Sequence, residues 1–225
     1  MRPLLILTGT FVAFSLAVAA PAPDAKYTYV DLKGKFNHKI TEKFHATDTD
    51  ENNLAIEPGK QKLGDIDFQI GDGVIQLGSI MVKEDPEKVE GIKIGSKFIK
   101  LHIIHACGYG GGPNTKPPGF VEDGTTIGEY KVYYDDKTTE TIPIVYGEDV
   151  RDWWFGKDEK EPSKSQVVWK SETEQSKKYM CGTRLYLSTW KNPKPGKKVV
   201  SIDYIGRKTE TGAAPFCVAM TLEGE

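Results

Sequence analysis

Two adjacent tryptophans, preceded by an arginine and an acid, form the most chemically suggestive group in the chain. Arg151, Asp152, Trp153 and Trp154 are consecutive, and they follow a strand-like run that ends at Gly147. Tryptophan has a large apolar face with a polar edge, and arginine and aspartate make paired hydrogen bonds. Sugar binding needs flat apolar faces for the rings and planar polar groups for the hydroxyls. The segment is therefore a candidate carbohydrate-binding site.

A loop rich in glycine and proline supplies two further ligand-binding candidates. Tyr109 and Asn114 lie within residues 107–123, which contain five glycines and three prolines. No regular element can be placed in such a composition. The predicted ligand-binding set is Trp153, Trp154, Arg151, Asp152, Tyr109 and Asn114.

The four residues from Arg151 to Trp154 also have a structural interpretation. Tryptophan is highly buried on average. In an extended segment adjacent side chains point to opposite faces, so at most one of Trp153 and Trp154 would be free. Arg151 and Asp152 would then be a pair that fixes the loop, or would simply be solvated.

Oxygen ligands at alternate positions suggest a calcium site. Asp48, Asp50 and Asn52 have the spacing of the first ligands of an EF-hand loop. Asn53 stands where that loop needs glycine, and Gly59 stands where it needs a bidentate glutamate, which excludes an EF-hand. A looser structural calcium site and a solvated acidic loop are the two remaining interpretations.

Catalytic patterns are poor, and we assign no catalytic residue. His102 and His105 are three apart in a predicted strand, so they point to opposite faces and would not hold one metal together. Neither a G-x-S-x-G turn nor the spacing of a phosphate-binding loop is found. A pair of glycosidase carboxylates stays an alternative, because 32 acidic residues supply many pairs.

Alternating apolar residues predict the strands that position the tryptophan pair. Tyr130, Val132 and Tyr134 alternate with polar residues, and Ile142 and Ile144 do so again after a polar turn. Pro143 cannot donate a backbone hydrogen bond, which favours an edge position for the second strand.

Other runs complete an all-β pattern. The nearly continuous apolar run 98–106 predicts a central strand buried on both faces. Weaker strands are expected at 27–32 and 39–44, and 172–178 is expected to be a polar turn. No helix of three turns is found, and many short strands separated by turn residues indicate a sandwich or barrel. The remaining predicted strands are 66–70, 74–80, 167–169, 184–190, 199–205 and 216–222.

The N-terminus predicts export. Arg2 supplies positive charge, 4–18 is a short apolar run, and 17–19 is a small-residue cleavage site. No later stretch is apolar enough to span a bilayer. We expect a signal peptide at 1–19, a tether and first strand at 20–38, and a β-sandwich domain at 39–225. The mature protein is expected to be periplasmic or extracellular.

Composition bears on the class of partner, on the size of the core and on the state of the cysteines. The chain has 30 basic and 32 acidic residues, a net charge of −2, which argues against nucleic acid. A mature chain of roughly 206 residues buries about 70% of its unfolded surface, enough for a core without a metal or disulfide. Cys217 lies in an apolar run and is expected to be a buried small hydrophobe. Cys107 and Cys181 either pair or stay free.

Four blocks of sequence occur in an order typical of one family. They are NL, PG and IDFQI within 53–70; IG, LH and HA within 94–106; IGEY, YD, IPIVYG and VRDWW within 127–154; and LYL, W, NP, IDY and PF within 185–216. With these blocks the chain resembles galactose-binding-like jelly-roll domains of exported bacterial proteins, especially planctomycete ones. The resemblance spans most of the mature chain. It implies two antiparallel sheets face to face, loops at one end for a ligand, and carbohydrate binding without catalysis.

Together these observations predict an all-β, two-sheet antiparallel β-sandwich of the jelly-roll type. Its expected function is that of an exported, non-catalytic, carbohydrate-binding module-like protein. A structural or protein-interaction sandwich of the cell envelope is the alternative, and a glycoside hydrolase is a third. The expected partner is a carbohydrate or an envelope protein. No cofactor is expected, apart from a structural calcium ion.

Overall fold

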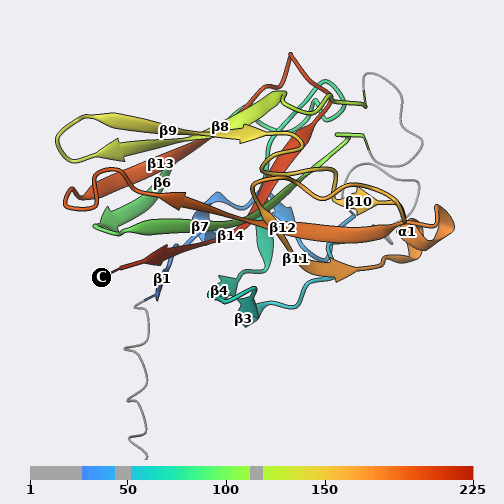
Figure 1. Ribbon diagram of the computed structural model, residues 1–225, viewed down its shortest axis with the longest axis horizontal. Coiled ribbons are helices and arrows are strands. Elements are labelled where there is room, and N and C mark those ends of the chain that lie inside the picture. The colour runs from blue at the N-terminus through green and yellow to red at the C-terminus, as the bar shows by residue number, and fades with distance from the viewer. Residues whose placement is uncertain (1–26, 44–51, 112–118, 225) are drawn as a thin grey trace, which may run out of the picture.

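Two antiparallel sheets lie face to face in the computed structural model, which describes residues 27–43, 52–111 and 119–224 (Figure 1). The larger sheet has the order β10-β12-β7-β14-β5-β2, with β1 beside β14 and β11 beside β12, and the smaller sheet has the order β6-β13-β8-β9. A hairpin, β3–β4, forms a separate two-stranded sheet and packs against β14, with Phe68 and Ile70 buried in the core. The all-β prediction is confirmed, and the packed sheets are consistent with a β-sandwich.

The strands of the larger sheet are β1 (Tyr27–Tyr29), β2 (His38–Lys39), β5 (Gly73–Gln76), β7 (Lys100–Gly108), β10 (Trp154–Phe155), β11 (Gln166–Ser171), β12 (Gly182–Lys191) and β14 (Ala214–Glu223). Those of the smaller sheet are β6 (Lys88–Ser96), β8 (Thr126–Tyr134), β9 (Thr139–Val145) and β13 (Val199–Gly206). The hairpin strands are β3 (Gly59–Leu63) and β4 (Ile66–Ile70), and the helices are the 3-10 turn η1 (Lys33–Lys35) and α1 (Glu174–Lys178).

Strand β7 is the central strand that its apolar run predicts. It lies between β12 and β14, and every residue after Lys100 is buried. His105 stands opposite Tyr186 of β12 and Cys217 of β14. The three cysteines are free and buried, as expected for Cys217.

The hairpin β8–β9 also follows the prediction. Its turn uses Lys137 in a left-handed conformation, with φ of 67°. β9 is an edge strand of the smaller sheet, which is where Pro143 is tolerated.

Several local predictions are wrong in detail. The strand expected at 74–80 ends at Gln76, and the one expected at 27–32 ends at Tyr29. The expected polar turn 172–178 contains the helix α1, because Thr173 and Ser176 form a reciprocal capping box. The strand expected at 39–44 is reduced to His38–Lys39. β3 was not predicted, because only Leu63 of its five residues is apolar, and pairing with β4 is what makes it a strand.

A polar chain crosses the interior between the sheets. Tyr130 of β8 and Tyr204 of β13 stack with ring centroids 4.6 Å apart. The Nδ1 atom of His105 lies 3.3 Å from the Tyr130 hydroxyl, and its Nε2 atom lies 2.8 Å from Oγ of Ser188. Burial disfavours the charged imidazolium and lowers the pKa of His105 to about 3. The ring is therefore neutral near pH 7.

We predict that His105 makes the fold sensitive to acid. The unfolded chain binds a proton at His105 near pH 6.5, whereas the folded chain does so only near pH 3. Stability should therefore fall as the pH falls through this window, by up to about 1.4 kcal/mol per pH unit. In His105→Gln this part of the slope should vanish, as measured by denaturant unfolding at a series of pH values.

His38→Gln is the control for this prediction. The hydrogen bond to Asp85 raises the pKa of His38. The contribution of His38 to the free energy of unfolding is therefore constant below pH 6.5 and is lost as the pH rises through the folded-state pKa. The control should keep the acid slope of the wild type. An unchanged slope in His105→Gln would contradict the assignment.

Candidate functional site

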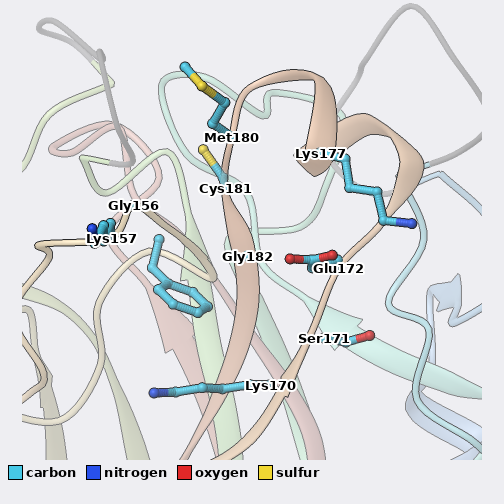
Figure 2. Close-up of a pocket in the computed structure, with 10 residues that line it drawn as sticks. Gly156, Lys157, Lys170, Ser171, Glu172, Lys177, Met180, Cys181 and Gly182 are labelled. Atoms are coloured by element: carbon cyan, nitrogen blue, oxygen red, sulfur yellow. The ribbon is translucent and has the colours of Figure 1, made fainter.

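An open pocket of about 790 Å³ lies at the end of the sandwich where β10, β11 and α1 meet the start of β12 (Figure 2). Its volume is within the range of about 300–1,000 Å³ that small-molecule sites occupy. We call it the β10–α1 pocket. It is lined by Phe155, Gly156, Lys157, Lys170, Ser171, Glu172, Lys177, Met180, Cys181 and Gly182.

The pocket is built from one continuous stretch of chain that begins just after the tryptophan pair. β10 pairs with β12 at Thr183 and Gly182, and β11 pairs with the other edge of β12, where Ser171 stands opposite Thr183. The helix α1 connects β11 to β12. Both walls are therefore set by the register of two short strands against the same residues of β12.

The helix end places an exposed methionine at the pocket. Met180 has φ of 56° and follows the last residues of α1, where glycine is the usual residue. The N–H of Met180 donates to the carbonyl of Lys177, and its side chain is 90% exposed. In Figure 2, Met180 and Cys181 lie at the helix end of the pocket and Lys170 lies at the opposite end.

Close packing around Gly182 holds Phe155 in the wall. A Cβ atom at Gly182 would come within 2.6 Å of the Phe155 ring, so the backbone and the ring fit only with glycine there. The guanidinium of Arg184 and the ammonium of Lys170 both lie over this ring, at 4.9 and 5.4 Å from its centroid. Phe155 is thus a structural wall with cations beside it.

A buried arginine ties these parts together. Arg184 is 1% exposed, and its Nη2 atom donates to Oε1 of Glu159 at 2.8 Å. Its other nitrogens donate to the carbonyls of Lys160 (3.2 Å) and Asp152 (3.3 Å). Burial raises the pKa of Glu159, although the attraction of Arg184 acts to lower it. The arginine therefore fixes the exit segment 151–155 and the next loop against β12.

An aromatic pair adjoins the lining residues in the sequence, because Trp154 precedes Phe155 and Tyr179 precedes Met180. The rings of Trp154 and Tyr179 lie 5.6 Å apart at 44°, and Tyr179 is 57% exposed. Trp154 is half-buried, and within the described part of the chain its buried indole N–H has no hydrogen-bond partner. This pair offers an apolar surface next to polar lining residues.

Trp153 belongs to the core instead. It is 2% exposed and packs edge-to-face against Phe216, with ring centroids 6.2 Å apart at 88°. The alternation of adjacent side chains in an extended segment thus divides the pair, with one ring inside and one at the surface. Trp190, on β12, is half-buried and packs edge-on against Phe98.

Arg151 and Asp152 fix the loops beside the tryptophans. Arg151 pairs with Asp123 at 2.6 Å rather than with its neighbour. The carboxylate of Asp152 accepts the backbone N–H groups of Gly110 and Trp154, both at 2.9 Å. Arg151 and Asp152 are both buried, so we assign them structural roles: they hold the loops that follow β7 and precede β10.

Of the other predicted site residues, the structure describes Tyr109 and Asn52, and neither lines the pocket. Tyr109 is half-buried with φ of 55°, and burial raises the pKa of its hydroxyl. Asn114, Asp48 and Asp50 lie outside the described residues. Asn52 is 1% exposed and accepts a hydrogen bond from Thr173 at 3.5 Å. In the described ranges, no group of three or more His, Cys, Asp or Glu side chains could hold a metal, and the calcium site stays a prediction.

Two hydroxyl–imidazole pairs were not anticipated from the sequence. Ser188 pairs with His105. The hydroxyl of Thr189 lies 2.8 Å from Nδ1 of His102, and Nε2 of the same ring lies 2.9 Å from Glu223. Such chains can activate a nucleophile when the imidazole accepts a proton near neutral pH. Burial lowers the pKa of both rings, to about 3 for His105, so each is a weak base.

The pocket itself was also not anticipated. Its lining residues are spread over β10, β11, the end of α1 and the start of β12, and they share no periodic pattern in the sequence. The available signal was the position of this stretch, directly after the two tryptophans.

Comparison with protein-family models, with curated proteins and with solved structures found no match. Across the described residues, no helix has the length and apolar character needed to cross a membrane.

We predict that Glu159 and Arg184 stabilise the site as a coupled pair. Glu159→Gln removes the charge opposite a buried guanidinium and should cost about 3–5 kcal/mol, the usual cost of breaking a buried pair. Denaturant unfolding of Glu159→Gln, Arg184→Met and the double variant would measure the coupling.

The double variant should lose less stability than the sum of the two single variants, because it leaves no unpaired buried charge. Additive losses would show that the two side chains act independently.

Proposed function

We propose that the protein is a non-catalytic carbohydrate-binding protein and that its ligand occupies the β10–α1 pocket. The observation that carries this proposal is the combination of an open pocket with hydrogen-bonding side chains and an exposed aromatic ring beside it. Sugar rings present C–H faces that pack on aromatic rings and hydroxyls that need donors and acceptors. The resemblance to galactose-binding-like jelly-roll domains supports the same function.

The polar side of the pocket suits hydroxyl groups. Lys157, Lys170 and Lys177 are donors, Glu172 is an acceptor, and Ser171 can serve as either. All five come from exposed or half-exposed positions, so a ligand can reach them.

The aromatic side is provided by Tyr179 and Trp154. Trp154 is backed by Trp153, with ring centroids 6.3 Å apart, so the platform rests on the core. A rigid aromatic surface loses little conformational entropy when a ligand binds.

Binding is better supported than catalysis. Glycosidases need two carboxyl groups on either side of the bond that is cleaved. Among the described lining residues Glu172 is the one acid, and Asp149 and Asp152 instead accept backbone N–H groups of their own loops.

We predict that Tyr179→Ala weakens the binding of a retained polysaccharide about tenfold, the loss typical of a central aromatic contact. Because Tyr179 is 57% exposed, the free energy of unfolding of the variant should stay within about 0.5 kcal/mol of the wild-type value. Affinity electrophoresis against a panel of polysaccharides would measure the loss.

Phe120→Ala is the matched control, because Phe120 is 50% exposed and lies on the other candidate loop, outside the pocket. It should bind as the wild type does. Loss of binding in Phe120→Ala alone would move the site to residues 107–123. Retention of no polysaccharide by the wild type would refute the function.

A second candidate function is protein interaction, and Met180 is the observation that favours it. A methionine that is 90% exposed, at a backbone position that suits glycine, is a typical contact residue of an adaptable binding surface.

Met180→Gly separates the two functions without harming the fold. Glycine is favoured at this left-handed position, so the variant should be up to about 1 kcal/mol more stable in denaturant unfolding. Capture of a single envelope protein that is lost in this variant, with no polysaccharide bound, would favour the interaction function. Carbohydrate binding predicts no such loss, and lower stability of the variant would contradict the backbone argument.

A further inference from the structure

The lysines of the β10–α1 pocket give it a charge that differs from that of the whole chain. Lys157, Lys170 and Lys177 line it, against Glu172 as the one acid among the described lining residues. The whole chain has 30 basic and 32 acidic residues. A cleft lined mainly by one sign of charge concentrates ligands of the opposite sign. The lining therefore suits an anion.

We propose that the β10–α1 pocket takes an acidic saccharide whose sugar rings carry carboxylates, as uronic acids do. This inference rests on the proposed carbohydrate-binding function and names the class of saccharide for the same site. A lysine ammonium has three donors, so it can bind a carboxylate and a neighbouring hydroxyl together. Hydrogen bonds between charged groups are also roughly twice as strong as neutral ones.

The lysines are available to a ligand. Lys170 lies 3.4 Å from Glu161 and Lys177 lies 2.7 Å from Glu174, and all four side chains are at least half exposed. Exposed pairs of this kind contribute little to stability, so a carboxylate of the ligand can replace the protein partner. Lys157 makes no ion pair with any described residue.

The aromatic wall does not offset this preference. Lys170 and Arg184 already lie over the Phe155 ring, so this ring carries cations where a neutral sugar would stack. Stacking is left to Tyr179 and Trp154 at the flank.

Glu172 limits how much negative charge the pocket accepts. It sits among the lysines and would repel a densely sulfated chain more than one with a single carboxylate on each ring. The geometry therefore favours polyuronates over polysulfates of similar length.

The test compares retention of the mature protein by polygalacturonate, by neutral dextran and by dextran sulfate. We expect tightest binding to polygalacturonate. Raising the salt concentration from about 0.1 to about 1 M shortens the screening length from about 10 to about 3 Å, and binding should weaken accordingly. Lys157→Gln should weaken it about fivefold, the upper range for an exposed charge.

Lys93→Gln is the matched control, because it makes the same change of charge on β6 of the other sheet and should bind as the wild type does. Equal retention on dextran with no effect of Lys157→Gln would overturn the acidic assignment and leave the proposed function standing. Tightest retention on dextran sulfate would overturn the choice of carboxylate. If Lys93→Gln weakens binding as much as Lys157→Gln, the charge of the whole protein and not the pocket is responsible, and the inference fails. Retention on no polysaccharide, neutral or acidic, would refute the proposed function and the inference together.

Discussion

A single buried cation constrains the whole end of the sandwich that carries the pocket. Arg184 is 1% exposed and bonds to Glu159 and to the carbonyls of Asp152 and Lys160. A buried guanidinium that lost these partners would cost several kcal/mol, so the segments that supply them must stay in place. The exit strand β10 and the loop after it are thereby held against β12. The Phe155 wall of the pocket follows from this, because the same guanidinium lies over its ring.

Adjacent or nearby side chains of one segment point to opposite faces, so some enter the core and others stay near the surface. On β7, His105 points between the sheets toward Tyr130, whereas His102 pairs with Thr189 and Glu223. In the exit segment, Trp153 enters the core and Trp154 stays at the surface. Polar side chains of the interior form hydrogen bonds with one another. Burial keeps the imidazole of His105 neutral, so this ring has a structural role and does not act as a reacting group. The side chains that line the β10–α1 pocket come from the stretch 155–182, which contains β10, β11 and α1.

Alternation in the sequence was enough to predict most of the strands, but not β3, β6 or the pocket. β7, β8 and β9 were identified because apolar residues repeat with the period of a strand, and Pro143 correctly marked the edge. β3 has only Leu63 as an apolar residue, so the alternation of apolar residues does not reveal it, and it becomes a strand by pairing with β4 across the turn at Gly64 and Asp65. Arg184 looked like an ordinary strand residue, since its partners Glu159 and Lys160 are more than twenty positions away. The pocket depends on where β10 and β11 register against β12, which no single segment specifies.

The most direct measurement is a map of backbone amide shifts on the isotope-labelled protein titrated with a short oligogalacturonate. Saturable shifts should gather at Gly156, Lys170, Ser171 and Gly182, on both walls of the β10–α1 pocket. They should be absent around Phe120 and Tyr109. Shifts confined to residues 107–123, or no saturable shifts on titration, would contradict the account.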